Sequence, residues 1–146
     1  KLRTRVDLTR SLPAFRHNLQ QIIHRVTQDG ARLVLATQPY LYHGDMTAEE
    51  RDSLFYAYYY RDYAIVPTMA EQIAAMDTFN ATVRELASQP DIILVDLEQS
   101  LPKSSEWMGD DVHYTAQGSA AVARFFFDRL PWVELLSGTA GAIKVY

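Results

Sequence analysis

Apolar residues recur at three- and four-residue steps in three stretches of the chain, which is the spacing of helices that bury one face. The first stretch, residues 11–30, starts at Ser11 and ends at Gly30, and both residue types suit the ends of a helix. The second spans residues 67–90 between two prolines, and the third spans residues 115–130. We therefore expect three helices, whose core-facing positions are Phe15, Leu19, Ile22, Ile23 and Val26, then Met69, Ile73, Met76, Val83 and Leu86, then Ala121, Val122, Phe125 and Phe126.

Two short runs between these helices, residues 31–39 and 91–98, are mainly apolar, which is the pattern of strands buried on both faces. Because helix and strand alternate along the chain, the fold class is α/β. We expect residues 33–35 and 92–95 to form adjacent or near-adjacent parallel strands with helices on at least one face. Two strands make a poor sheet by themselves. Weaker candidates for further strands are residues 2–6 and 142–146.

The composition fits one ordinary globular domain and excludes several classes of function. The chain has 146 residues, of which 48% are hydrophobic and 22% charged, enough to bury a substantial core. A net charge of -4, with lysine and arginine scattered along the sequence, provides no basic surface for nucleic acid. No apolar run approaches the roughly 18 residues of a membrane span, and the absence of cysteine excludes disulfides and thiolate chemistry. We interpret residues 1–146 as a single domain without a membrane span.

Candidate chemistry is concentrated in the sequence GDDVHYTAQG, residues 109–118. If residues 110–113 form a β-turn, the first and fourth Cα atoms lie within about 7 Å of each other. The Asp110 carboxylate can then accept the Nδ1 proton of His113 and leave Nε2 outward as a base, which is the base half of a nucleophilic triad. The alternative is structural: Asp110 caps a turn, Thr115 caps the following helix and His113 is merely exposed. The spacing alone leaves both interpretations open.

The surroundings of this turn are similar to a known family. The segment DDVHYTAQGSAAVARFF follows a run that ends in LVDLE, and it resembles the C-terminal block of the SGNH/GDSL hydrolases, which are serine esterases and lipases. The segment FRHNLQQIIHRVTQDGARLVLATQP resembles a later helix and strand of that family, so the similarity covers residues 15–130. The resemblance implies part of a three-layer α/β/α, flavodoxin-like fold with parallel strands, a small-molecule ester as substrate and no cofactor. It also implies that His113 is the general base and Asp110 the residue that orients it, with Asp111 a solvated neighbour.

Part of the family's machinery has no counterpart in this sequence. The nucleophilic serine of the family lies in a Gly-Asp-Ser block, and a glycine and an asparagine from two later blocks complete the oxyanion hole. Here the Gly-Asp pairs at Gly44 and Gly109 do not continue to serine, and Asn18 and Asn80 lie within predicted helices. We assign no serine as nucleophile, and we interpret residues 1–146 as the C-terminal portion of a longer hydrolase domain that is inactive by itself.

Such a portion would leave apolar surface without its neighbours. The edge of the strand at residues 33–36 and the helix stripe of Phe15, Leu19 and Ile23 would then be exposed. Exposed strand edges and apolar patches recruit partners. We therefore expect a companion N-terminal segment, a homo-oligomer or poor solubility.

Residues 40–66 form an aromatic-rich insertion after the first strand and contain seven of the nine tyrosines. Thr47 and Glu50 have the spacing of a capping box and predict the start of a helix within it. In one interpretation the insertion is a lid or substrate wall, because long insertions after a strand stand beside the crevice of an α/β fold. In the other it covers the core with one helical face, made of Leu54, Phe55, Tyr58 and Tyr59.

Three classes of function follow from these residues. The first is an ester hydrolase in which His113 takes the proton of a serine supplied from outside the chain. The second is a divalent-metal site, for which a second clustered histidine is missing; its ligands would be Asp110, Asp111 and His113, with Asp96 as a further one. The third is a non-catalytic binding or assembly module that has the fold without the chemistry, which the missing serine favours.

Overall fold

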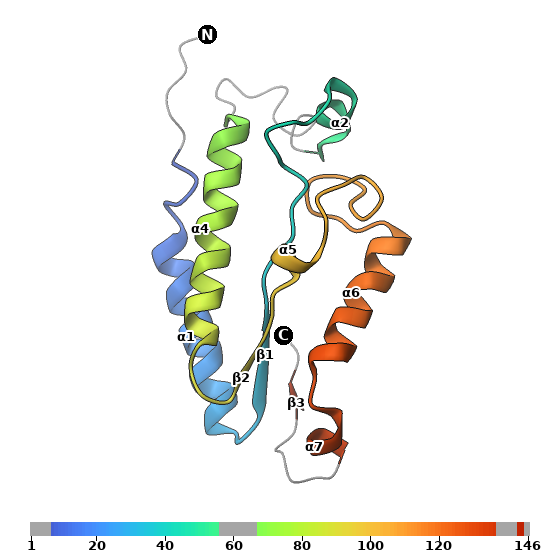
Figure 1. The fold of residues 1–146 in the computed structure, drawn as a ribbon. Helices are drawn as coiled ribbons and strands as arrows, with labels where there is room; N and C mark the ends of the chain where they lie inside the picture. The colour runs from blue at the N-terminus through green and yellow to red at the C-terminus, as the bar shows by residue number, and fades with distance from the viewer. Residues whose placement is uncertain (1–6, 56–66, 137–142, 145–146) are drawn as a thin grey trace.

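The computed structural model describes residues 7–55, 67–136 and 143–144. Helices and strands alternate along most of this length (Figure 1). In chain order the elements are α1 (Leu12–Gln28), β1 (Arg32–Ala36), α2 (Ala48–Ser53), α4 (Met69–Ala87), β2 (Ile92–Val95), α5 (Leu97–Ser100), α6 (Ala116–Arg129), α7 (Trp132–Leu136) and β3 (Ile143–Lys144). The three long helices and the two central strands expected from the sequence are confirmed. None of the described helices combines the length and the apolar character needed to cross a membrane.

The sheet is parallel, and β1 lies between β2 and β3. Leu33 of β1 pairs with Ile92 of β2, so the two predicted strands are adjacent and run in the same direction. The chain is therefore an α/β protein, as its alternating pattern predicts. β3 lies within the weaker candidate 142–146 and pairs with the first two residues of β1, so that part of this edge has a neighbour. The other weak candidate, residues 2–6, lies outside the described residues.

Side chains of β1 alternate between two cores, because successive residues of a strand point to opposite faces. Leu33 and Leu35 are buried among residues of α1 and α4. Val34 lies in a second cluster, against which Phe125 and Phe126 of α6 pack. Figure 1 shows α1 and α4 on one side of the strands and α6 on the other. Helices therefore cover both faces of the sheet.

Helix α1 buries most of its apolar stripe against α4 and β1. Ile23 is 6% exposed, Leu19 packs on the same cluster, and Phe15 meets Phe79 of α4 edge-on with 5.0 Å between ring centroids. The expectation that this stripe lacks neighbours is wrong, because α4 supplies them. Ile22, which the periodicity also assigns to the stripe, is 37% exposed and lies at its margin.

Helix α1 begins and ends close to the residues predicted from the sequence, but each end differs from the prediction in one detail. Ser11 stands at the N-cap, but its side chain makes no capping hydrogen bond. At the other end Asp29 is the C-cap, and Gly30 follows it with φ +68°. Glycine adopts this left-handed conformation without steric cost, which lets the chain turn from the helix into β1.

The described part of the insertion, residues 40–55, contributes to a third hydrophobic core, which it shares with residues of the segment after β2. The predicted capping box at Thr47 and Glu50 is confirmed at the start of α2. The buried residues of this core are Tyr40, Leu41, Tyr42, Met46, Leu54, Leu101 and Met108.

The sequence assigns the wrong face to one residue of the insertion. Leu54 covers the core as expected, but Phe55 is 49% exposed and does not. The reason is that α2 ends at Ser53 and Leu54 is extended, so Phe55 does not continue the turns of that helix. Tyr58 and Tyr59 lie outside the described residues.

Candidate functional site

Residues 109–113 form a turn, here called the site turn, at the tip of a hairpin that precedes α6. Met108 and Tyr114 pair in an antiparallel bridge at its base. Inside this bridge the Gly109 amide donates a hydrogen bond to the His113 carbonyl at 2.8 Å. Both ends of the site turn are therefore fixed by backbone contacts.

Helix α6 approaches this hairpin closely at Gly118. The Thr115 hydroxyl accepts a hydrogen bond from the Gly118 amide at 3.0 Å, which caps the helix as predicted. A Cβ atom at Gly118 would lie 1.9 Å from the Trp107 carbonyl oxygen, so only glycine allows this approach. The first turn of α6 is therefore packed against the base of the hairpin.

The side chains of Asp110 and His113 are hydrogen-bonded to each other, as the sequence predicts. Atom Nδ1 of His113 lies 2.9 Å from Oδ1 and 2.8 Å from Oδ2 of Asp110. With Nδ1 as the donor, a neutral imidazole keeps Nε2 unprotonated and able to accept a proton. The His113 side chain is 71% exposed, whereas that of Asp110 is 23% exposed. This is the geometry of an accessible imidazole oriented by a carboxylate.

Hydrogen bonds favour the ionised form of Asp110. Desolvation is the largest single influence and acts to raise its pKa, but the amides of Val112 and His113, together with the His113 ring, hold the pKa below its usual value. The two amides lie 3.0 Å and 2.9 Å from Oδ1. An ionised carboxylate can hold an imidazole in one tautomer and stabilise its protonated form.

The same carboxylate also has the structural role that the sequence left open. Asp110 accepts hydrogen bonds from amides two and three residues ahead, which closes the site turn as an Asx turn does. The two interpretations of GDDVHYTAQG are therefore compatible. The backbone contacts build the turn, and the ring contact orients His113 on it.

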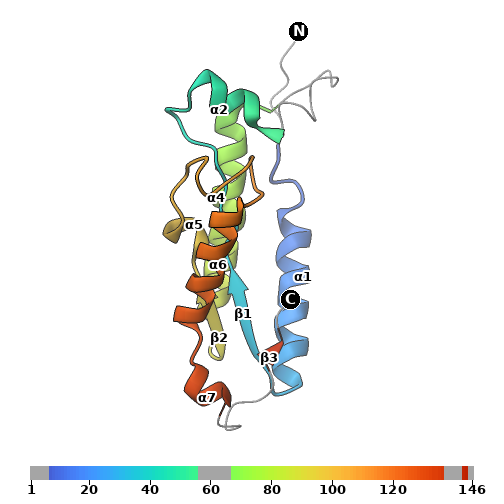
Figure 2. The same ribbon diagram turned by 90° about the vertical axis from the view of Figure 1, so that its right-hand side faces the viewer.

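The site turn lies on the carboxyl side of the sheet. Figure 2 shows β1 running towards α2 and the loops that precede α6. The segment after β1 contacts the turn: the Leu41 amide donates to the Asp111 carbonyl at 2.9 Å, and the Gln38 side-chain amide donates to the Val112 carbonyl at 3.4 Å. Parallel α/β sheets bind ligands at this edge, so the turn occupies a favourable position for chemistry.

Asp111 is not the solvated neighbour that the resemblance implies. It is 4% exposed, and the buried Tyr42 hydroxyl donates to its carboxylate at 2.8 Å. A buried carboxylate needs a hydrogen-bond partner, and this one comes from a residue 69 positions earlier in the chain. Local spacing cannot reveal such a pair, although the cluster of tyrosines after the first strand is the signal that would have suggested candidates.

The insertion reaches the candidate base through Phe55. Its ring stands edge-on to that of His113, with 6.4 Å between centroids and an interplanar angle of 89°. Leu54, directly before it, is 1% exposed and anchors this end of the segment in the third core. A partly exposed aromatic side chain therefore lies beside the imidazole.

A nucleophile does not accompany the base in the part of the chain that the structure describes. There, no serine hydroxyl is hydrogen-bonded to the His113 ring. The hydroxyls of Ser53, Ser88 and Ser100 instead donate to backbone carbonyls three or four residues earlier. These contacts are those of helix ends rather than of an activated nucleophile.

Asn80 has a structural role that its helical position conceals. It is 2% exposed and hydrogen-bonds both backbone groups of Gln38, accepting from the amide at 2.8 Å and donating to the carbonyl at 2.9 Å. Its side chain therefore takes the place of a strand partner just beyond the end of β1. This contact supports the same segment that holds the site turn.

Asp96, the further ligand of the metal alternative, is instead hydrogen-bonded to Arg84 and Thr37. Its carboxylate accepts hydrogen bonds at 2.8 Å from Arg84 and at 2.8 Å from the Thr37 hydroxyl. The Arg84 hydrogen bond is the main cause that holds the pKa of Asp96 below its usual value. Among the described residues, no three carboxylate, imidazole or thiolate side chains gather closely enough to hold a metal ion.

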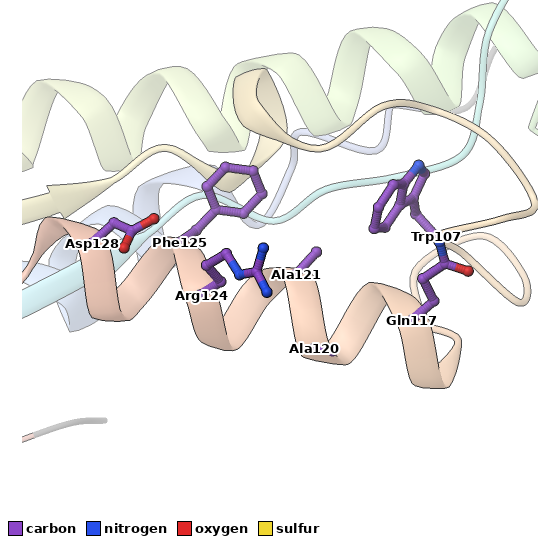
Figure 3. Close-up of a pocket in the computed structure, with 7 residues that line it drawn as sticks. All are labelled: Trp107, Gln117, Ala120, Ala121, Arg124, Phe125 and Asp128. Atoms are coloured by element: carbon purple, nitrogen blue, oxygen red, sulfur yellow. The ribbon is translucent and has the colours of Figure 1, made fainter.

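A pocket of about 370 Å³ lies beside α6, but His113 does not line it. Figure 3 shows the rings of Trp107 and Phe125 above α6, with Ala121 between them and Arg124 next to Phe125. Its complete lining is Trp107, Gln117, Ala120, Ala121, Arg124, Phe125 and Asp128. The pocket lies apart from the candidate base, because the imidazole stands at the tip of the hairpin and Trp107 at its base.

The chain matches no protein-family model, no curated protein and no solved structure with which it was compared. The resemblance to the SGNH/GDSL hydrolases therefore rests on residues of this chain alone.

Proposed function

We propose that Asp110 and His113 form the base half of a Ser-His-Asp triad in an ester hydrolase of the SGNH/GDSL type. The observation that carries this proposal is the contact of 2.8 Å between Nδ1 of a largely exposed His113 and a carboxylate that is mostly buried. An oriented imidazole at the carboxyl side of a parallel sheet is the arrangement that activates a hydroxyl nucleophile.

In this proposal Nε2 of His113 takes the proton of a serine hydroxyl as the serine oxygen attacks the ester carbonyl. The imidazolium then gives that proton to the departing alkoxide, and water removes the acyl group in a second round of the same steps. Asp110 keeps the proton of the neutral ring on Nδ1 and stabilises the imidazolium. The reaction requires no cofactor.

The serine and the oxyanion donors come, in this proposal, from a companion segment outside residues 1–146. The chain is then the C-terminal portion of a three-layer α/β/α, flavodoxin-like domain. Two observations support this view: helices cover both faces of a small parallel sheet, and among the described residues β3 pairs with Arg32 and Leu33 alone of the β1 edge. The rest of that edge is where further parallel strands would add.

The insertion would form one wall of the substrate site. Phe55 supports this role because its partly exposed ring contacts His113, while Leu54 fixes the backbone beside it. An aromatic wall next to the base favours esters with an apolar group close to the scissile bond.

A second candidate function is a non-catalytic binding or assembly module with the same fold. One observation favours it: the hydrogen bonds of Asp110 to two backbone amides are sufficient reason for an aspartate at this position. In such a module His113 would have no catalytic role.

Hydrolysis of a short-chain nitrophenyl ester distinguishes the two functions. The assay uses residues 1–146 alone and the same chain joined to the sequence encoded upstream of Lys1. We expect turnover only by the joined protein, a loss of about 10³-fold or more in kcat for His113→Ala, and a loss of about 10³-fold for Asp110→Asn, which favours the wrong tautomer.

The matched control is His17→Ala, which removes an exposed histidine of α1 and should leave turnover unchanged. A joined protein that neither hydrolyses the ester nor reacts with a fluorophosphonate would favour the non-catalytic module. Robust turnover by residues 1–146 alone, abolished by His113→Ala, would show that the nucleophile lies within this chain.

A further inference from the structure

A buried hydrogen bond attaches the site turn to the segment after β1. The Tyr42 hydroxyl donates to Oδ2 of Asp111 at 2.8 Å, and both residues are 4% exposed. The Leu41 amide adds a second bond, to the backbone carbonyl of the same aspartate, at 2.9 Å. Asp111 is thus held through its backbone and its side chain, and it lies between the two residues of the proposed base.

This attachment bears on the orientation of the imidazole. The His113 side chain is 71% exposed, so solvent surrounds most of the ring and its orientation depends on the backbone beneath it. That backbone belongs to a turn of five residues, in which a shift at Asp111 moves both Asp110 and His113. A hydrogen bond from a hydroxyl to a carboxylate, shielded from water, resists such a shift strongly.

We propose that Tyr42 and Asp111 are positioning residues, which hold the site turn so that His113 keeps its Nδ1 contact with Asp110. The catalytic consequence rests on the proposed hydrolase function, whereas the orientation of the ring can be measured without any activity. The start of the insertion, which contains Tyr42, then has a structural role in the site. Tyr42 connects the segment beside the sheet to the base.

Tyr40 provides a matched control within the same segment. It is 2% exposed, and its hydroxyl donates to the Asp77 carboxylate of α4 at 2.5 Å. Burial, together with the Asp77 contact, raises the pKa of Tyr40, so the hydroxyl remains a donor. Tyr40→Phe and Tyr42→Phe therefore remove the same group from equally buried rings, but only Tyr42→Phe releases the site turn.

The experiment compares the two variants with the wild-type chain by ¹⁵N NMR of the histidine rings. Wild type and Tyr40→Phe should keep the His113 proton on Nδ1, whereas Tyr42→Phe should shift the ring towards the tautomer mixture of a free imidazole. In the joined protein Tyr42→Phe should lower kcat about tenfold or more with little change in KM, because a misplaced base slows the chemical step rather than binding. Tyr40→Phe should stay within about twofold of wild type.

A folded Tyr42→Phe variant with the His113 tautomer of wild type would overturn the proposal. If Tyr42→Phe does not fold, Asp111→Ala and Asp111→Asn replace it: the alanine should disturb the tautomer, and the asparagine, which keeps an acceptor for Tyr42, should restore most of it. Equal spectra for these two variants would also overturn the proposal. A disturbed tautomer in a protein without esterase activity would retain the positioning role and remove the hydrolase function, so the two failures are distinguishable.

Discussion

At the scale of single residues, Gly118 shows how a missing side chain builds the site. A Cβ atom there would lie 1.9 Å from the carbonyl oxygen of Trp107 and 2.9 Å from its carbonyl carbon. These are backbone atoms and cannot rotate away, so α6 would have to move from the hairpin that carries Asp110 and His113.

We therefore expect Gly118→Ala to destabilise the protein. Alanine gains up to about 1 kcal/mol in helix propensity, but overpacking against a fixed backbone costs about 1–3 kcal/mol or more. The net loss should be about 1–2 kcal/mol, or more if the backbone cannot yield, and is measured as a lower midpoint of urea unfolding. Gly44→Ala is the control, since no heavy atom lies within 4 Å of its added Cβ. Equal midpoints for both variants would mean that α6 does not pack on Trp107 as described.

Among the contacts of the candidate site, that between Asp110 and His113 could be predicted from the sequence, whereas that between Tyr42 and Asp111 could not. Asp110 and His113 are three positions apart, and a turn is sufficient to bring their side chains together. Asp111 and Tyr42 are 69 positions apart, and their contact exists only because β1 and β2 are paired and the loops after them meet. Burial of a charged residue is a tertiary property that no local pattern contains.

At the scale of elements, α2 and α4 both begin with a capping box, but the two boxes should contribute differently to the stability of the protein. The amide of Thr47 donates to Glu50 at 2.7 Å, and that of Thr68 donates to Glu71 at 2.7 Å, each within a full capping box. Helix α4 has 19 residues and joins two cores, whereas α2 has six residues, none of them buried.

We expect Thr68→Ala to lower the free energy of unfolding by about 1 kcal/mol, because α4 cannot lose its first turn without loosening the core. Thr47→Ala should leave the global value within about 0.5 kcal/mol, because α2 can fray by itself. Urea unfolding measures the first effect, and faster amide hydrogen exchange confined to α2 measures the second. A global loss of equal size in both variants would show that α2 unfolds together with the core.

The elements that the sequence could predict are those with a long enough apolar pattern. The helices α1, α4 and α6 and the strands β1 and β2 have periodic or continuous apolar patterns that follow from burial on one or two faces. β3 has two described residues, too few for a periodic pattern, so the sequence indicates a strand at residues 142–146 only weakly. The exposure of Phe55 depends on where α2 ends, and ends of short helices are set by contacts such as that of Leu54 with the third core.

At the scale of the whole molecule, one polar network joins elements from both halves of the chain. Arg84 of α4 binds Asp96 after β2 at 2.8 Å and Glu98 of α5 at 2.6 Å. The Thr37 hydroxyl, just after β1, donates to Asp96 and accepts from the Glu98 amide at 2.9 Å. The network therefore connects the carboxyl ends of β1 and β2 to α4, next to the start of the segment that holds the site turn.

The sign of its pH dependence follows from Asp96. The hydrogen bond from Arg84 is the main reason why the pKa of this carboxyl is lower in the folded protein than its ordinary value of about 3.9. A group with a lowered folded pKa adds stability above its unfolded pKa and loses that contribution as the pH falls through the folded value. The stabilisation by Asp96 should thus be complete above about pH 5 and be lost as the pH falls through the lowered pKa of the folded protein.

We expect Asp96→Asn to be less stable than wild type by about 1–3 kcal/mol at pH 7, because Arg84 is left without one of its partners in a partly buried setting. The difference should shrink as the pH is lowered from about 5 to 2, since only the wild-type protein has this carboxylate to protonate. Urea unfolding of both proteins across this range measures it, with Asp52→Asn on the exposed face of α2 as the control for a change in net charge. A stability difference that stays constant from pH 7 to 2 would show that Asp96 contributes through its shape and hydrogen bonding rather than through its charge.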